Sequence, residues 1–269
     1  MIPEDATDSV SRESWARVPS TATAAGLAFY RQHVADLRLA ASESSLVDEL
    51  ERLATTVARA IFKEREPRET LPSVFDDVDR ARATKDANLG PLREVLVARY
   101  IDNFLAYVAE LMGLLFRHQP AALSSREQVS LEDVLRHGSI DEFVTWAADE
   151  RINRLSYKGL GEIADYFGTR FGLELVDDLA IRRDLLRGVA VRNLLVHRRG
   201  VVDRRFIATL SAEGFDVDRY ALGERIPTVN NFETLPAVAL SVRSLEARVV
   251  AKFGVPVHEV DAHQWWVAR

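Results

Sequence analysis

Cysteine is absent from this chain of 269 residues. Disulfide bonds and thiolate metal sites are therefore excluded. The chain also lacks any run of about eighteen apolar residues, the length that a membrane-spanning helix requires. Its first residues, MIPEDATDSVSRESW, are acidic and polar, unlike a secretory signal. Together these absences predict a cytoplasmic protein without a membrane segment.

The composition that is present is typical of a globular protein, but the charge is unevenly distributed. With 47% hydrophobic and 28% charged residues, the chain has ample material for a core. Its net charge is −6, yet residues 182–205 contain eight arginines and two aspartates, a net charge of +6 that leaves −12 on the remainder. Such a segment attracts a polyanion locally. A solvated charged surface is the alternative explanation.

The spacing of apolar residues predicts an all-α fold with few and short strands. Ser45, followed by Asp48 and Glu49, indicates an N-terminal cap for a helix that extends to about residue 65. Prolines then interrupt the pattern, and DANLGP at residues 86–91 predicts a loop. Further helices are expected at 92–119, 130–135, 139–155, 157–172, 175–200 and 235–254. We expect a boundary between Pro67 and Pro91, which separates a helical N-terminal extension (residues 1–91) from an α-helical domain (residues 92–269).

The most informative segment is VRNLLVHRRGVVDRR, residues 191–205. On a helical wheel with about 100° per residue, Arg192, Asn193 and His197 fall among aliphatic side chains, away from a charged face around Arg183. A helix that is apolar on most of its circumference is generally buried. Buried polar groups need partners or a function, because an unsatisfied one costs roughly 1–3 kcal/mol.

Helix capping is the alternative explanation for the same residues. Cationic side chains near a helix C-terminus bind the last carbonyl groups and favour the helix dipole by roughly 0.3–1 kcal/mol. Gly200 is a natural helix terminator, so His197, Arg198 and Arg199 have the positions of capping cations. The residues alone leave both interpretations open.

The same residues resemble the signature of the HEPN superfamily. RNLLVH is an arginine, a polar residue and a histidine five positions after the arginine, and the continuation HRRGVVDRRFI resembles the usual end of that helix. The segments ARYIDNFLAYVAELMGLLFRHQPAAL, SIDEFVTWAADERINRLSYKGLGEIADYF and YALGERI are similar in order to large bacterial HEPN-like proteins. The resemblance covers about residues 92–254 and implies a HEPN-like helical bundle.

The resemblance implies metal-independent cleavage of RNA, without a cofactor, at the interface of a homodimer. His197 would act as general acid or base for the ribose 2′-OH and the leaving 5′-oxygen, since histidine as a residue type titrates near neutral pH. Arg192 would hold the scissile phosphate and stabilise the transition state. Asn193 would orient the imidazole or the phosphate. Many HEPN-like domains instead bind RNA or nucleotides, or serve as assembly modules, without catalysis.

Other basic residues of this region are expected to attract the RNA phosphates. They are Arg187, Arg198, Arg199, Arg204 and Arg205. The resemblance further implies a toxin or an antiviral defence effector, with an antitoxin or another defence-system protein as a partner.

Several other residues are candidates for a supporting or separate function. Asp102 and Asn103 are predicted to give polar support to the site. Lys158–Gly161, KGLG, lacks a preceding strand and is predicted to be a turn at a helix start. Trp265 and Trp266 are expected to dock the C-terminus or a partner. The trio His258, Asp261 and His263 forms a poor metal cage, so no metal is predicted.

Overall fold

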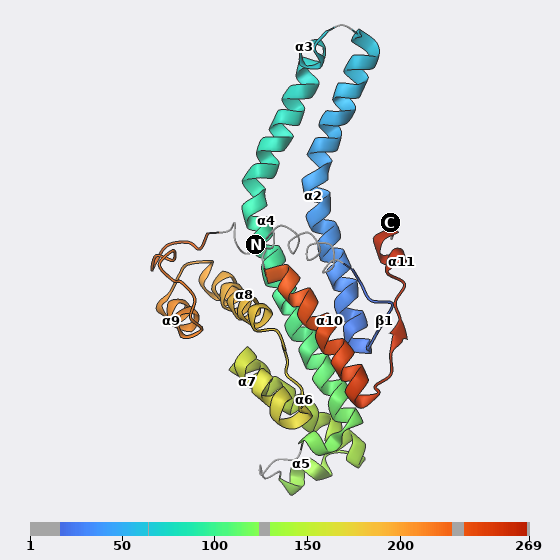
Figure 1. The fold of residues 1–269 in the computed structure, drawn as a ribbon, viewed down its shortest axis with the longest axis vertical. Coiled ribbons are helices and arrows are strands. Elements are labelled where there is room, and N and C mark those ends of the chain that lie inside the picture. Colours follow the sequence, from blue (N-terminus) through green and yellow to red (C-terminus); the bar gives the residue numbers. More distant parts are fainter. Residues whose placement is uncertain (1–16, 64, 124–129, 228–233, 268–269) are drawn as a thin grey trace, which may run out of the picture.

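The computed structural model describes residues 17–63, 65–123, 130–227 and 234–267, and the fold is all-α, as the sequence predicts (Figure 1). Two short strands, β1 (Thr21–Ala22) and β2 (His258–Glu259), pair antiparallel. The α-helices are α2 (Ala24–Phe62), α3 (Pro67–Thr70), α4 (Pro72–His118), α5 (Leu131–Leu135), α6 (Ile140–Lys158), α7 (Leu160–Tyr166), α8 (Leu179–Arg198), α9 (Arg204–Ala212), α10 (Thr234–Phe253) and α11 (Ala262–Val267). A 3-10 turn, η2 (Pro120–Leu123), follows α4, and a π-helical turn, η3 (Phe167–Phe171), follows α7.

Helix α4 is the centre of the core, because its C-terminal half contacts α2, α6, α8 and α10. Its buried side chains recur every three or four residues, which places them on the faces that these helices cover. Burying each large apolar side chain stabilises the fold by roughly 1.5–3 kcal/mol. The fully buried ones include Leu96, Val97, Tyr100, Ile101, Phe104, Tyr107, Leu111, Leu115 and Phe116.

The distal parts of α2 and α4 leave this core and project as an antiparallel helical hairpin with α3 at its tip (Figure 1). Val47, Ala54 and Ala58 of α2 are buried there. Ion pairs also join the elements of the hairpin, since Arg68 bonds both Glu51 and Asp79. Apolar side chains, including Phe75 and Val78 of α4, and charge pairs therefore hold the hairpin together.

Two sequence predictions about this N-terminal region are wrong. Ser45 does not begin a helix, because α2 runs continuously from Ala24 to Phe62. The loop expected at residues 86–91 is also absent, since α4 continues through Gly90 and Pro91. Local signals for a cap and a break are outweighed here by packing along the hairpin. The expected boundary therefore lies within α4, and the division of the chain at residue 91 stays a prediction.

Other predicted helix ends are confirmed. Helix α4 ends at His118, two residues before Pro120. The Ser139 hydroxyl accepts a hydrogen bond from the Glu142 amide at 3.2 Å and caps α6. Gly172 terminates η3 in the left-handed region, with φ at 58°. Helix α10 tolerates a proline at its third residue.

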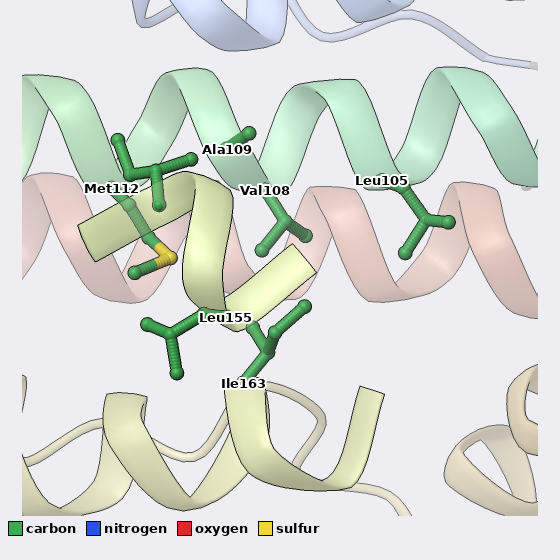
Figure 2. Close-up of a pocket in the computed structure, with 7 residues that line it drawn as sticks. Leu105, Val108, Ala109, Met112, Leu155 and Ile163 are labelled. Atoms are coloured by element: carbon green, nitrogen blue, oxygen red, sulfur yellow. The ribbon is translucent and has the colours of Figure 1, made fainter. Parts of the chain in front are cut away.

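A small apolar cavity lies between α4, α6 and α7 (Figure 2). Its volume is about 30 Å³, and all the residues that line it have apolar side chains: Leu105, Val108, Ala109, Met112, Ile152, Leu155 and Ile163. These side chains offer no polar or titratable group to a ligand. Within the described ranges, no helix is both long and apolar enough to cross a bilayer.

Candidate functional site

Helix α8 carries the three candidate catalytic residues, and its two ends are well defined. The Asp178 carboxylate caps its start by accepting hydrogen bonds from the amides of Ala180 and Ile181, at 2.8 and 3.0 Å. At the other end, Arg199 adopts the left-handed conformation with φ at 55°, and the Gly200 amide donates to the Leu194 carbonyl at 3.0 Å. The sequence predicted Gly200 as the terminator, but the left-handed turn already begins at Arg199.

The turn after α8 is hydrogen-bonded to the segment YALGERI, residues 220–226. The Ile226 amide donates to the Gly200 carbonyl at 2.8 Å, and the Val202 amide donates to the Glu224 carbonyl at 2.9 Å. Arg225 donates to the Arg199 carbonyl at 2.9 Å and forms an ion pair with Glu94 of α4. These contacts fix the backbone directly beyond His197. Arg225 is a basic residue of the site that the sequence analysis missed, because no local pattern marks it.

Arg192 is held against α4. Its guanidinium forms an ion pair with Asp102, with 2.6 Å between Nη2 and Oδ1, and also donates to Asn193 Oδ1 at 3.1 Å. Its side chain is 22% exposed, and its Nε is buried without a partner in the structure. Asp102 was predicted to give polar support to the site, and it contacts Arg192; its role in a site stays a prediction. Asn103 points elsewhere, since its amide donates to the Phe29 carbonyl of α2 at 3.2 Å.

Asn193 and His197 lie on the solvent side of α8, so the expectation that they are buried among aliphatic side chains is wrong. Both are exposed, as is Val196 at 50%. Helices α4 and α10 pack on α8, whose buried residues are Leu185, Gly188, Ala190, Val191 and Leu194. The opposite face of the last turns of α8 is exposed to solvent. Asn193 and His197 are four residues apart and therefore adjoin on one helix face.

The predicted RNA-binding arginines separate into two locations. Four surround the turn next to His197, where Arg198 bonds the Asp203 carboxylate at 3.2 Å and two others begin α9. All four are exposed, and they are Arg198, Arg199, Arg204 and Arg205. We call them the arginine cluster. It follows the exposed His197 directly along the chain.

Arg187 lies apart from the arginine cluster, about ten residues or 15 Å along α8 from His197. It lines a groove of about 430 Å³ between α8 and the segment after α9. There it bonds Asp184 at 3.0 Å and lies over the Phe215 ring, 5.9 Å from the centroid, while Arg183 lies 4.4 Å from the same centroid. Its role in RNA binding stays a prediction.

The capping interpretation is only partly supported by the contacts. Among the residues that the structure describes, no side chain of His197 or Arg199 donates to a carbonyl of α8, and Arg198 bonds Asp203 instead. A favourable interaction with the helix dipole remains for the two arginines. Direct capping therefore does not account for them.

The C-terminal segment packs on α2. Arg38 donates to the Trp265 carbonyl at 2.9 Å, and the Arg31 guanidinium lies 5.7 Å from the Trp265 ring centroid. The predicted docking of Trp265 is confirmed, whereas the side chain of Trp266 lies outside the described residues. His258 belongs to β2. Over the described part of the chain, no three His, Asp or Glu side chains group as metal ligands.

Two further features involve glycine and a buried acid. Gly159, with φ at 99°, forms the turn between α6 and α7 that KGLG predicted.

Glu246 of α10 is buried and accepts hydrogen bonds from the Thr23 amide at 2.7 Å, the Thr23 hydroxyl at 2.8 Å and the Tyr107 hydroxyl at 3.1 Å. Burial raises the pKa of this carboxyl. The sequence analysis missed it, although a lone acid within an apolar helical stretch is a usable signal.

Comparison with models of known protein families, with curated proteins and with solved structures gives no match.

Proposed function

We propose that the chain is a cytoplasmic, metal-independent endoribonuclease that uses Arg192, Asn193 and His197. One observation carries the proposal: a solvent-exposed histidine is followed within eight residues by four exposed arginines, and five residues before it an arginine is anchored by Asp102. The resemblance of this segment to the HEPN signature supports the same assignment. It also suggests a toxin or antiviral defence effector, restrained by an antitoxin or another partner protein.

The proposed reaction is a transesterification within the RNA strand. His197 removes the proton from a ribose 2′-OH, and the 2′-oxygen attacks the adjacent phosphorus. The bond from phosphorus to the 5′-oxygen breaks, and that oxygen takes a proton from a protonated histidine. The products are a 2′,3′-cyclic phosphate and a 5′-hydroxyl. Arg192 neutralises the charge that develops on the phosphate, and no metal ion takes part.

We also propose that two copies of α8 face one groove in a homodimer. One histidine acts as base and a second as acid, so two copies of the site supply both groups. Val196, half exposed beside His197, offers an apolar contact for such a two-fold interface. In this arrangement the two arginine clusters flank the RNA strand.

The direct test incubates the purified protein with total RNA in EDTA. The wild type is expected to cleave, and His197→Ala is expected to lose about 10²–10⁴-fold in rate, because one proton-transfer group is removed. His263→Ala, which removes another exposed histidine, is the matched control and should retain full activity. Equal cleavage by His197→Ala and wild type would overturn the assignment.

A second experiment separates binding from chemistry. Replacing Arg198 and Arg199 by glutamine should weaken the binding of single-stranded RNA and reduce the slope of log K against log salt by roughly 0.7 for each phosphate that the protein no longer neutralises. His197→Ala should leave most of the affinity unchanged, because acid–base contacts act mainly on the barrier. Arg80 and Arg136, both exposed and both in local ion pairs, provide the control double variant.

The alternative is a non-catalytic RNA-binding or assembly module, and the Arg192–Asp102 ion pair is the observation that favours it. A carboxylate that already occupies the guanidinium competes with a substrate phosphate. Salt-dependent RNA binding without any cleavage in EDTA would select this alternative.

A further inference from the structure

Helix α2 exposes an unusual row of aliphatic side chains on the projecting hairpin. Leu50, Leu53, Val57 and Ile61 are 44%, 56%, 42% and 63% exposed. We call these four residues the apolar stripe. The sequence pattern suggests that they form a core face, but no described element covers them. Contiguous exposed apolar side chains of this kind mark interaction surfaces.

The hairpin itself does not use the apolar stripe. The side chains of α2 that are buried there are Val47, Ala54 and Ala58, and the acids Asp48 and Glu51 bond Arg82 of α4. On a helical wheel the stripe occupies an arc of about 80°, centred about 75° from those buried residues. The stripe therefore faces a direction in which another helix can pack beside α2 without displacing α4.

The spacing of the stripe is that of a helix–helix seam. Its residues follow one another at intervals of three, four and four, an eleven-residue spacing close to three helical turns, so they form a nearly straight row along α2. A single straight seam of this kind is matched by another helix with the same pattern. A second copy of α2 provides one.

The charges on α2 indicate which way a second copy would run. From Val47 to Glu51 the helix has three acids and no base, and from Arg52 to Lys63 it has three bases and no acid. Asp48 and Glu51 bond Arg82 of α4, whereas Glu49 bonds only Arg52 of its own helix among the described residues. Two antiparallel copies place each acidic half against a basic half, whereas two parallel copies place like charges together. Arg59 and Lys63 form no ion pair with another described residue. The helix is thus complementary to its own antiparallel copy.

We propose that two chains associate through their apolar stripes, with α2 antiparallel to α2 of a second copy about a two-fold axis near residue 55. Leu50 then lies opposite Ile61 of the partner subunit, and Leu53 lies opposite Val57 of the partner subunit. Glu49 lies beside Lys63 of the partner subunit. Seen along the axis of α2, the stripe and the side that contacts α4 lie roughly at a right angle. Two hairpins that meet at their stripes therefore form a four-helix bundle.

This interface is independent of the proposed ribonuclease activity and of the α8 interface. An isologous contact uses one surface on both copies, so two different two-fold contacts build a tetramer as their smallest closed assembly. Changes in the stripe and changes around His197 therefore act on separate steps of assembly. Failure of one proposal leaves the other testable.

The first test measures the oligomeric state of the full chain by sedimentation at micromolar concentration. Leu53→Lys with Val57→Lys should dissociate the stripe interface, raising its Kd by at least 100-fold. Both side chains are exposed, so the fold should survive and circular dichroism should be unchanged. The matched control replaces Leu131 and Leu135 of α5 by lysine. These aliphatic side chains are 72% and 73% exposed, and their replacement should not alter assembly. The proposal is overturned if the wild-type chain is monomeric, or if the Leu53→Lys/Val57→Lys variant assembles as the wild type does.

The second test examines the partner and its direction. Glu49→Lys and Lys63→Glu should each weaken association, and the double variant should restore it, because the two charges exchange places across the same interface. If a different protein occupied the apolar stripe, the double variant would not restore association. Because the chain has no native cysteine, a single introduced cysteine carries the only spin label on each copy. Labels at position 63 should be separated by at least about 23 Å along the helix axes, and labels at position 56 should be close together. Close labels at both positions would indicate a parallel pair and contradict the proposal.

Discussion

Arg192 of α8 and Asp102 of α4 form an ion pair with 2.6 Å between Nη2 and Oδ1. The pair joins the proposed phosphate-binding residue to the central helix of the core. The Asp102 side chain is 48% exposed, so water screens the pair and its contribution to stability is at most about 1 kcal/mol. Its main consequence is geometric: it limits where the guanidinium lies relative to Asn193 and His197.

Asp102→Ala is expected to lower kcat by about 10-fold or more while leaving KM nearly unchanged, because a misplaced arginine raises the barrier more than it weakens binding. Asp102→Asn keeps an acceptor for the guanidinium and should recover part of the rate. Steady-state kinetics on a defined RNA measures both effects. The neighbouring Asn103→Ala is the control: it loses the bond to the Phe29 carbonyl and should affect stability without the fall in kcat. Equal kinetic effects at the two positions would show that Asp102 has no positioning role.

Arg199 holds a left-handed conformation that favours glycine. Arg199→Gly should therefore raise the free energy of unfolding by about 1 kcal/mol. The same change should reduce RNA affinity, because one cation of the arginine cluster is lost. Denaturant unfolding and RNA titration test the two effects. Arg199→Ala removes the same charge without the conformational gain, so it should bind RNA as weakly but unfold more easily than Arg199→Gly. The reverse order of stability would contradict this explanation.

Gly188 is a point of close approach between α8 and α10. A Cβ at this position would lie 2.1 Å from Cγ2 of Thr234 and 3.0 Å from Cδ1 of Ile101. Gly188→Ala should therefore destabilise the fold by roughly 1–3 kcal/mol, as overpacking does. Gly161 lies in α7, and a Cβ there meets nothing within 4 Å. Gly161→Ala should be neutral or stabilise by up to about 1 kcal/mol. Thermal unfolding of both variants tests the packing, and equal effects would contradict it.

Glu246 should make stability depend on pH in a direction opposite to that of an ion-paired acid. Burial raises the pKa of its carboxyl in the folded state above the ordinary value of 4.5. The folded state therefore binds the proton more tightly, and this contribution to stability is fully present below pH 4.5 and is lost as the pH rises through the folded pKa. The destabilisation caused by Glu246→Gln should thus be largest in acid and smaller near pH 8.

Denaturant unfolding of both chains across this pH range tests the sign. The difference between wild type and variant cancels other titrating groups, such as Asp36, whose pKa burial also raises. A penalty that grows with pH would show that Glu246 is stabilised in its charged form.

The sequence predicts the α-helical class and most helix ends of the C-terminal part, because capping residues and apolar periodicity act locally there. It fails along the hairpin. Ser45 and Pro91 carry local signals for a start and a break, yet both lie inside helices that are stabilised by one another. Which signal prevails depends on tertiary contacts between residues far apart in the chain, and a single sequence does not display them.

The candidate site is predictable to a similar degree. The spacing of Arg192, Asn193 and His197 on one helix follows from the sequence, and so does polar support from Asp102. Their burial does not, because a helical wheel shows which residues share a face but not which faces other helices cover. Arg225 reaches the site through a backbone contact with Arg199, and no pattern in its own segment indicates this.

Removal of the ribose 2′-hydroxyl at the cleavage site examines whether His197 cleaves RNA through that group. An RNA oligonucleotide with a mapped cleavage site is compared with the same strand that carries 2′-deoxyribose at that site, both in EDTA. We expect cleavage of the first strand to a 2′,3′-cyclic phosphate and a 5′-hydroxyl, with no cleavage of the second and none of either by His197→Ala. Equal cutting of the deoxy strand, or wild-type rates in His197→Ala, would contradict it.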